Sequence, residues 1–260
     1  MRNSKDVSLE SWRKSGCRLR KFLLSDAALG LYDELTAQSL VVRLGDIAAV
    51  RVGYVTGAND FFHLKPSTAR AMRLPEDVLR VAVRNAQQLP KETVDGEIVR
   101  SWLRRDEPVL LLHLERGTVI SPEILRYLDS QEGLQIREAY KCRNRTPWYA
   151  VPDVRPPDAF LSYMSGISPV LVRNGARCVC SNSLHGIFMK RRSDLRVLQQ
   201  KWNHPLALLS CELEGHPLGG GMLKAEPREA ANISVPIGDL HLTPSDKYTL
   251  DSAINEMRSW

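Results

Sequence analysis

The chain has 260 residues, a formal net charge of +6 and a sequence pI of about 9.1. This length suffices for one large domain or two small ones, and the basic balance suits a polyanionic partner without requiring one. No stretch approaches the ~18–20 apolar residues of a membrane span, and the polar N-terminus lacks the apolar run of a signal peptide. We therefore expect a cytoplasmic protein with no membrane partner. Five scattered cysteines, an odd number, fit free thiols in a reducing compartment.

The first 39 residues are expected to form a basic N-terminal arm with linker helices. Lys and Arg side chains interleave with apolar ones up to residue 25. This pattern fits either a helix that docks on the rest of the protein or a solvated basic arm. Ser25 marks a helix start, because serine caps helix N-termini, and Leu29, Leu31 and Leu35 form the apolar side of that helix.

Residues 51–62, with the sequence Arg-Val-Gly-Tyr-Val-Thr-Gly-Ala-Asn-Asp-Phe-Phe, are the most distinctive stretch. An apolar run leads into two glycines four positions apart, and an Asn-Asp pair and a Phe pair follow. Glycine reaches backbone angles that strain other residues, and Asn and Asp stabilise turns. The pattern predicts a strand, an irregular turn and a second strand, as in a tight hairpin with Phe61 and Phe62 in the core.

The remaining elements mix strands and helices without a regular βαβ alternation. We predict strands at 40–44, 78–83, 109–114, 160–164 and 169–172. We predict helices at 66–72, 194–202 and 206–213, and a further helix that starts at 121 and has an apolar stripe to about 140. The ordered part is expected to end at Val235-Pro236, followed by a tail (238–260) with a final helix at 249–257. This order argues for an α+β fold with a mixed, mostly antiparallel sheet and peripheral helices.

Four blocks, in order, carry a resemblance to a known family. They are Gly53-x-x-Thr56-Gly-Ala-Asn-Asp-Phe-Phe62, Tyr140-Lys-Cys-Arg-Asn-Arg-Thr-Pro-Trp-Tyr149, Ser181-Asn-Ser-Leu-His-Gly-Ile187 and Gly219-Gly-Gly-Met-Leu-Lys-Ala-Glu-Pro-Arg228. Together they resemble the target-recognition domain of the TaqI-like N6-adenine DNA methyltransferases, a group that includes the fused type IIG restriction-modification enzymes. The resemblance covers residues 40–237 and implies a fold similar to a DNA-methylase specificity domain, with double-stranded DNA as partner.

The catalytic motifs of that family are missing. Its members carry a Gly-containing motif after a first strand and an Asn/Asp-Pro-Pro-aromatic motif. Here the only Pro-Pro pair, Pro156-Pro157, has the wrong neighbours, and Gly219-Gly-Gly221 follows a helical stretch. We therefore assign no catalytic residue and no cofactor to this chain. S-adenosylmethionine is expected in a partner methyltransferase domain or subunit, as part of an adenine-specific DNA methyltransferase.

No metal site is assigned either. One conceivable set lacks the paired spacing of structural zinc sites: Cys142, Cys178, Cys180, Cys211 and His185. A conceivable nuclease set has a spacing that is common on surface helices: Asp129, Glu132, Glu138 and Lys141.

Basic residues interleaved with aromatics and small polar groups are the candidate DNA contacts. Arg pairs bidentately with guanine or phosphate, Asn with adenine, and aromatic rings stack. The candidates are Thr56, Asn59, Lys141, Arg143, Asn144, Arg145, Trp148, Tyr149, Ser181, Asn182, His185, Lys190, Arg191, Arg192 and Lys224. The alternatives stay open: the aromatics could anchor a loop to the core, the small polar groups could satisfy loop backbone, and the charges could form a solvated face. In the resembled family the Arg143–Tyr149 block belongs to the framework of the domain.

These observations predict a sequence-specific double-stranded DNA recognition module that acts with a methyltransferase partner. The alternatives are a catalytic methyltransferase or nuclease subunit of a restriction-modification system, and a scaffold subunit of a defence complex that does not read sequence. A DNA-binding regulator is disfavoured because no helix-turn-helix signal is found.

Overall fold

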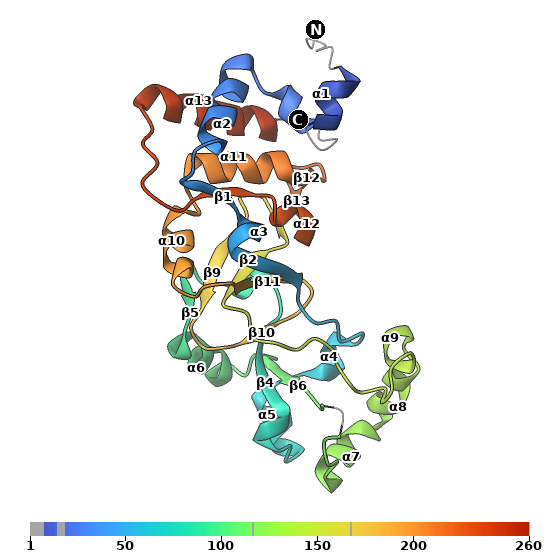
Figure 1. Ribbon diagram of the computed structural model, residues 1–260. Helices are drawn as coiled ribbons and strands as arrows, with labels where there is room; N and C mark the ends of the chain where they lie inside the picture. Colours follow the sequence, from blue (N-terminus) through green and yellow to red (C-terminus); the bar gives the residue numbers. More distant parts are fainter. Residues whose placement is uncertain (1–7, 15–18, 116, 167, 260) are drawn as a thin grey trace. The chain divides into compact units, whose positions relative to one another are not determined.

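The computed structural model describes residues 8–14, 19–115, 117–166 and 168–259 (Figure 1). The chain forms two compact units. Unit 1 comprises Met1–Val50, Ser162–Leu171 and Ile187–Trp260, and unit 2 comprises Arg51–Leu161 and Val172–Gly186. The boundary between the units falls within four strands: β2 (Ala48–Val52), β7 (Ala159–Ser162), β9 (Leu171–Asn174) and β11 (Leu184–Met189).

Unit 1 is built around three helices, α2 (Asp26–Thr36), α11 (Pro205–Glu214) and α13 (Pro244–Arg258), which pack side by side (Figure 1). Strands β1 (Val41–Arg43) and β14 (Ser234–Pro236) pair antiparallel, with Val42 opposite Val235. Strands β12 (His216–Pro217), β13 (Leu223–Lys224) and β8 (Met164–Ser165) form a second antiparallel sheet. The other helices are α1 (Leu9–Lys14), η1 (Arg20–Leu23), α3 (Leu44–Ile47), α10 (Asp194–Lys201) and α12 (Pro227–Ala230).

Unit 2 contains a four-stranded sheet in the order β10 (Val179–Cys180), β4 (Leu79–Val83), β6 (Leu110–Leu112) and β3 (His63–Leu64). Strand β10 runs parallel to β4, and the other two pairs are antiparallel. Strand β5 (Thr93–Val94) pairs in parallel with β9. The helices are α4 (Asn59–Phe62), α5 (Pro66–Ala71), η2 (Glu76–Val78), η3 (Ala86–Gln88), α6 (Gly96–Arg104), α7 (Pro122–Leu128), α8 (Gln131–Arg137) and α9 (Tyr140–Arg143).

The fold class is confirmed as α+β, with mixed and mostly antiparallel sheets. Ser25 and Ser121 cap α2 and α7 through their side-chain oxygens, as their positions in the sequence predict. The apolar run at 109–114 contains β6, an interior strand of its sheet. In the part of the chain that the structure describes, no helix is long and apolar enough to cross a membrane.

The predicted hairpin at residues 51–62 is wrong. Strand β2 is followed by irregular chain and then by the one-turn helix α4, and β3 pairs with β6 rather than with β2. The hydroxyl of Thr56 stabilises this turn, because it accepts a hydrogen bond from the Ala58 amide and donates one to the side chain of Asn59. Phe61 and Phe62 are core residues as expected, 1% and 0% exposed, but they extend from a helical turn.

Two further predictions need correction. The apolar stripe from 121 to 140 is broken into α7, α8 and α9, because the Ser130 hydroxyl accepts from the Gly133 amide and starts a new helix. The ordered part continues beyond Pro236. Helix α13 starts at a capping box formed by Thr243 and Asp246, and its apolar side lies in the same core as α2 and α11. The division of the chain into an arm, a recognition domain and a tail stays a prediction.

Candidate functional site

Two of the motif blocks meet along the backbone in unit 2. The Gly53 amide donates to the Leu184 carbonyl at 3.0 Å, and the Tyr54 amide donates to the Cys180 carbonyl at 3.0 Å. The Asn182 amide donates in turn to the Tyr54 carbonyl at 2.9 Å. A Cβ on residue 53 would lie 2.2 Å from the Ser181 carbonyl oxygen, so only glycine permits this approach.

A third block, residues 140–149, also contacts the turn at residues 53–62. The guanidinium of Arg145 donates to the carbonyls of Val55 and Thr56, both at 2.6 Å. Gly57 has φ of 85°, and a Cβ there would lie 2.5 Å from the Cβ of Lys141. We call the blocks 53–62, 140–149 and 181–186, joined in this way, the unit 2 framework.

Several predicted contact residues have internal partners in this framework. Thr56, Ser181 and His185 are 1%, 2% and 0% exposed. The Thr56 hydroxyl is bonded to Asn59 at 2.6 Å, and the Ser181 hydroxyl donates to the Arg84 carbonyl at 2.5 Å. The geometry therefore favours structural roles for these three side chains, and their contact with DNA stays a prediction.

The aromatic pair Trp148 and Tyr149 of the block 140–149 anchors its loop to the core. The ring of Trp148 lies 5.9 Å from that of Phe61 and 6.5 Å from that of Phe62. Tyr149 packs edge-on against Trp148 at 5.8 Å, and both are partly buried against the same core cluster. Stacking on bases would compete with this packing.

Helix α9 instead presents an exposed cationic surface. The Lys141 Nζ and Arg143 Cζ atoms lie 5.7 Å and 5.6 Å from the centre of the Tyr140 ring, which is 67% exposed. Lys141, Arg143 and Asn144 are exposed too, and the Asn144 amide donates to the Tyr140 carbonyl at 2.6 Å. Sequence reasoning missed Tyr140, although an aromatic residue next to two cations was a usable signal.

Two other exposed candidates lie elsewhere in unit 2. Asn59 starts α4, where its side-chain oxygen accepts from Thr56, and Asn182 follows β10. The exposed candidates of unit 2 are Asn59, Lys141, Arg143, Asn144 and Asn182.

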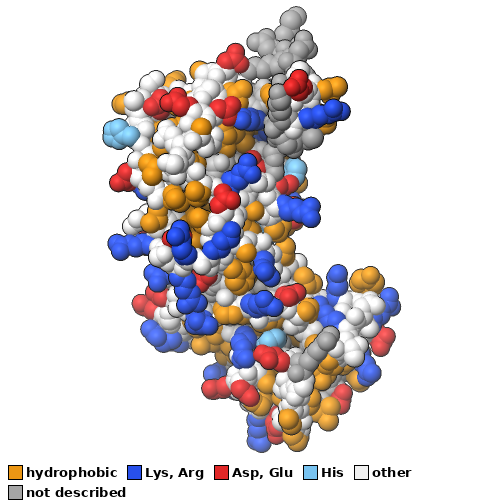
Figure 2. Space-filling model, in the orientation of Figure 1, with side chains coloured by type: hydrophobic (Ala, Val, Ile, Leu, Met, Phe, Trp, Pro, Cys, Tyr) orange, Lys and Arg blue, Asp and Glu red, His pale blue; other side chains and the backbone are white. Residues whose placement is uncertain are grey.

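The remaining candidates lie in unit 1. Lys190, Arg191 and Arg192 are exposed after β11, and Arg191 pairs with Asp194 at 3.2 Å. Lys224 forms an ion pair with Glu226 at 2.8 Å and lies over the Tyr163 ring, and the hydrogen bond to Glu226 raises the pKa of Lys224. Figure 2 shows Lys and Arg side chains across the face that it draws, with Asp and Glu between them, so the net charge is dispersed there.

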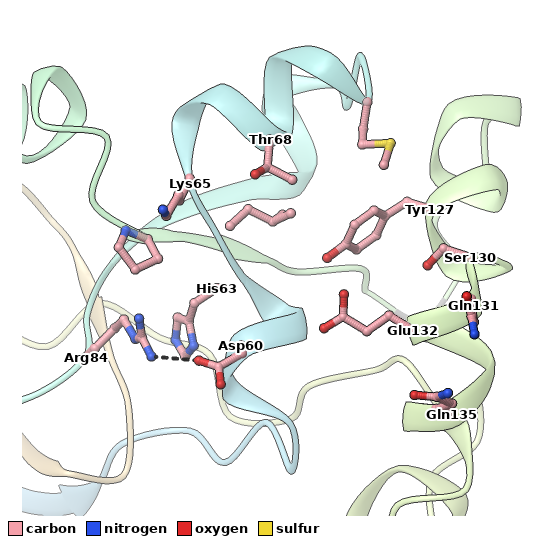
Figure 3. A pocket seen from close by; sticks show the side chains of 13 residues that line it. Asp60, His63, Lys65, Thr68, Arg84, Tyr127, Ser130, Gln131, Glu132 and Gln135 are labelled. Carbon is pink, nitrogen blue, oxygen red and sulfur yellow. Dashed lines mark hydrogen bonds and ion pairs between the residues drawn. The ribbon is translucent and has the colours of Figure 1, made fainter.

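Unit 2 also holds an open cavity of about 670 Å³ that sequence reasoning did not find (Figure 3). Arg84 and Asp60 form an ion pair at 3.3 Å on one side of it. His63 lies at its base, where Nδ1–H donates to the Asn59 carbonyl at 2.9 Å and Nε2 accepts from the Tyr54 hydroxyl at 2.8 Å. Burial lowers the pKa of His63 to about 4, so the imidazole is neutral at physiological pH.

The described residues contain no group of three or more His, Cys, Asp or Glu side chains that could hold a metal ion. The four cysteines among the described residues are free and buried, and burial raises the pKa of the Cys178 and Cys180 thiols to about 12 each. They are therefore protonated thiols at neutral pH.

The fold and the assembled motif blocks define an α+β domain of the kind found at the C-terminus of type II methyltransferases. Residues 18–259 match the family model of the C-terminal domain of Type II methyltransferase M.Eco57I, and the chain belongs to this family. The chain is 23% identical over 220 residues to Type II methyltransferase M.AccI of Acinetobacter calcoaceticus. Among solved structures it is similar to the type IIG restriction endonuclease BpuSI, with a TM-score of 0.49 and 14% identity.

These matches cover the chain but only part of each relative. They include 83% of this chain and 39% of M.AccI, and 99% of this chain and 30% of the BpuSI chain. The chain thus spans less than half the length of each of these relatives. The family resemblance indicated by the four motif blocks is confirmed.

Proposed function

We propose that this chain is the sequence-specific double-stranded DNA recognition module of an N6-adenine DNA methyltransferase or restriction-modification system. It acts with an S-adenosylmethionine-dependent methyltransferase domain or subunit and binds no cofactor itself. The observation that carries the proposal is the unit 2 framework, in which three motif blocks of the resembled recognition domain are joined by backbone hydrogen bonds and by the Arg145 guanidinium.

The exposed side chains beside this framework supply the chemistry that DNA binding needs. Lys141 and Arg143 form no ion pair with another described residue, so both cations are available to phosphates. Phosphate contacts set the register of a protein on the duplex, and other side chains then read base edges. The partner domain flips the adenine out of the duplex and methylates it. The Asn/Asp-Pro-Pro-aromatic motif for that step is missing here, and the chain spans only 39% of M.AccI.

The test is fluorescence anisotropy of the chain with a random duplex pool at several salt concentrations. We expect binding that weakens steeply with salt. The double variant Lys141→Ala/Arg143→Ala should flatten the slope of log K against log salt by about 2, since each lost phosphate contact removes about 0.9. The control is Arg104→Ala/Lys247→Ala, which removes the same charge from two exposed positions on other helices.

Each result has a clear meaning. Equal salt slopes for the two double variants would show that α9 does not contact DNA. No binding by the wild-type chain at low salt would contradict the proposal for this chain and favour a scaffold role.

A further inference from the structure

The open cavity of unit 2 lies between two walls of different chemistry (Figure 3). One wall comes from α4, β3, α5 and the residue after β4, and the other comes from α7 and α8. The framework contacts described above do not fill it. Its volume of about 670 Å³ and its open form leave room for a flat polar group that enters from solvent.

Two amide side chains on α8 have unused hydrogen-bonding capacity. Gln131 and Gln135 are one helical turn apart, line the cavity and are exposed. Neither amide side chain forms a hydrogen bond with another described residue. Glu132 extends into the cavity from the same helix (Figure 3).

The opposite wall carries two cations, and one of them is paired with a carboxylate. Arg84 is held by Asp60 at 3.3 Å, and Lys65 is exposed near it. His63 contributes no charge, because it is neutral and both of its ring nitrogens are already bonded. The cavity therefore offers the amides of Gln131 and Gln135 and the carboxylate of Glu132 on one wall, and Lys65 with the Arg84–Asp60 ion pair on the other.

This combination matches the edge of a nucleotide. The planar amide of glutamine pairs bidentately with the N6 and N7 atoms of adenine, and a carboxylate accepts from the N4 group of cytosine. Arg and Lys bind the phosphates that flank such a base.

We propose that the α8 wall of this cavity faces the major groove of the duplex, and that Gln131 and Gln135 are specificity-determining residues that reach base edges there and select adenine. Lys65 and Arg84 hold the adjoining backbone. This inference rests on the proposed function and adds to it the residues that read sequence.

The experiment selects preferred sequences from a random duplex pool with the 260-residue chain, the variants Gln131→Ala and Gln135→Ala, and the control Gln200→Ala. Gln200 is an exposed glutamine on α10, so the control repeats the same substitution on a helix of unit 1. A lost bidentate pair lowers discrimination at one base pair by about 5- to 150-fold. We expect each cavity variant to lose its preference for A·T at one position, while its affinity for random duplex and its salt slope stay unchanged.

The outcomes separate this inference from the proposed function. Salt-dependent binding by the wild-type chain with the same selected sequence for both cavity variants would overturn the inference alone. Wild-type binding without any selected sequence would also overturn it and leave a DNA-binding module that does not read bases. A uniform loss of affinity for all duplexes in the cavity variants would assign the glutamines to general binding and refute the reading role. No duplex binding by the wild-type chain would contradict the proposed function itself.

Discussion

Arg145 and Arg143 are two residues apart, and the structure predicts opposite consequences for their removal. Arg145 donates two hydrogen bonds of 2.6 Å to the carbonyls of Val55 and Thr56. A hydrogen bond with a charged partner contributes about 1.5–3 kcal/mol to stability. Because Arg145 is half-buried, water can replace part of the two lost hydrogen bonds. We therefore expect Arg145→Ala to lower the free energy of unfolding by about 2–4 kcal/mol, near the low end for two such bonds. Arg143→Ala removes an exposed side chain and should cost within about 0.5 kcal/mol.

Two measurements distinguish the variants. The first is hydrogen exchange of residues 53–62 measured at increasing urea concentrations. This segment should open at lower urea in Arg145→Ala and keep wild-type protection in Arg143→Ala. Duplex binding at low salt, measured on folded protein, should weaken in Arg143→Ala with a flatter salt slope. The reasoning is refuted if Arg145→Ala keeps wild-type protection at 53–62, or if Arg143→Ala destabilises that segment.

Two further predictions concern stability. The pKa of His63 is about 4 in the folded protein against 6.5 as its ordinary value. The unfolded chain therefore binds a proton between these values that the folded chain does not, and the unfolding free energy should fall by about 2 kcal/mol from pH 6.5 to pH 5. In urea titrations at several pH values, His63→Gln should reduce this pH dependence. The control His241→Gln, at an exposed position, should retain it. The same dependence of unfolding free energy on pH in both variants would contradict the assignment to His63. Gly53→Ala would place a methyl group 2.2 Å from the Ser181 carbonyl oxygen and should destabilise by about 3 kcal/mol or more. Gly30→Ala, in α2 with open space around the new methyl group, should stabilise by about 0.5–1 kcal/mol, and a similar effect at both glycines would refute the steric argument.

Two helix starts that depend on nearby residues were predictable from the sequence. Ser25 and Ser121 each accept from the amide three residues on, and a cap of this kind is visible in the sequence. The turn at 51–62 was not predictable, because its path depends on Arg145, about 90 residues away. Adjacent phenylalanines fit a buried strand as well as a helical turn inside a core, and periodicity cannot separate the two over so few residues.

The candidate site shows why motif residues and contact residues differ. Arg145 and Ser181 belong to recognisable blocks, and the side chains of both donate hydrogen bonds to backbone carbonyls of unit 2. A side chain with its hydrogen bonds used inside the protein has little left for a base edge. Gln131 and Gln135 have no such partner among the described residues, yet they lie in no motif.

The cavity of unit 2 combines residues from position 60 to position 135, so no local pattern could mark it. Its cationic wall is nevertheless fixed to the framework. The carbonyl of Arg84 accepts from the buried Ser181 hydroxyl, and its guanidinium pairs with Asp60 next to the start of α4. The blocks that identify the family therefore hold one wall of the cavity in place, while the side chains of Gln131 and Gln135 of α8 on the other wall form no hydrogen bond with another described residue. Under the proposed function, a different target sequence would then require new side chains at these two positions and no change in the fold.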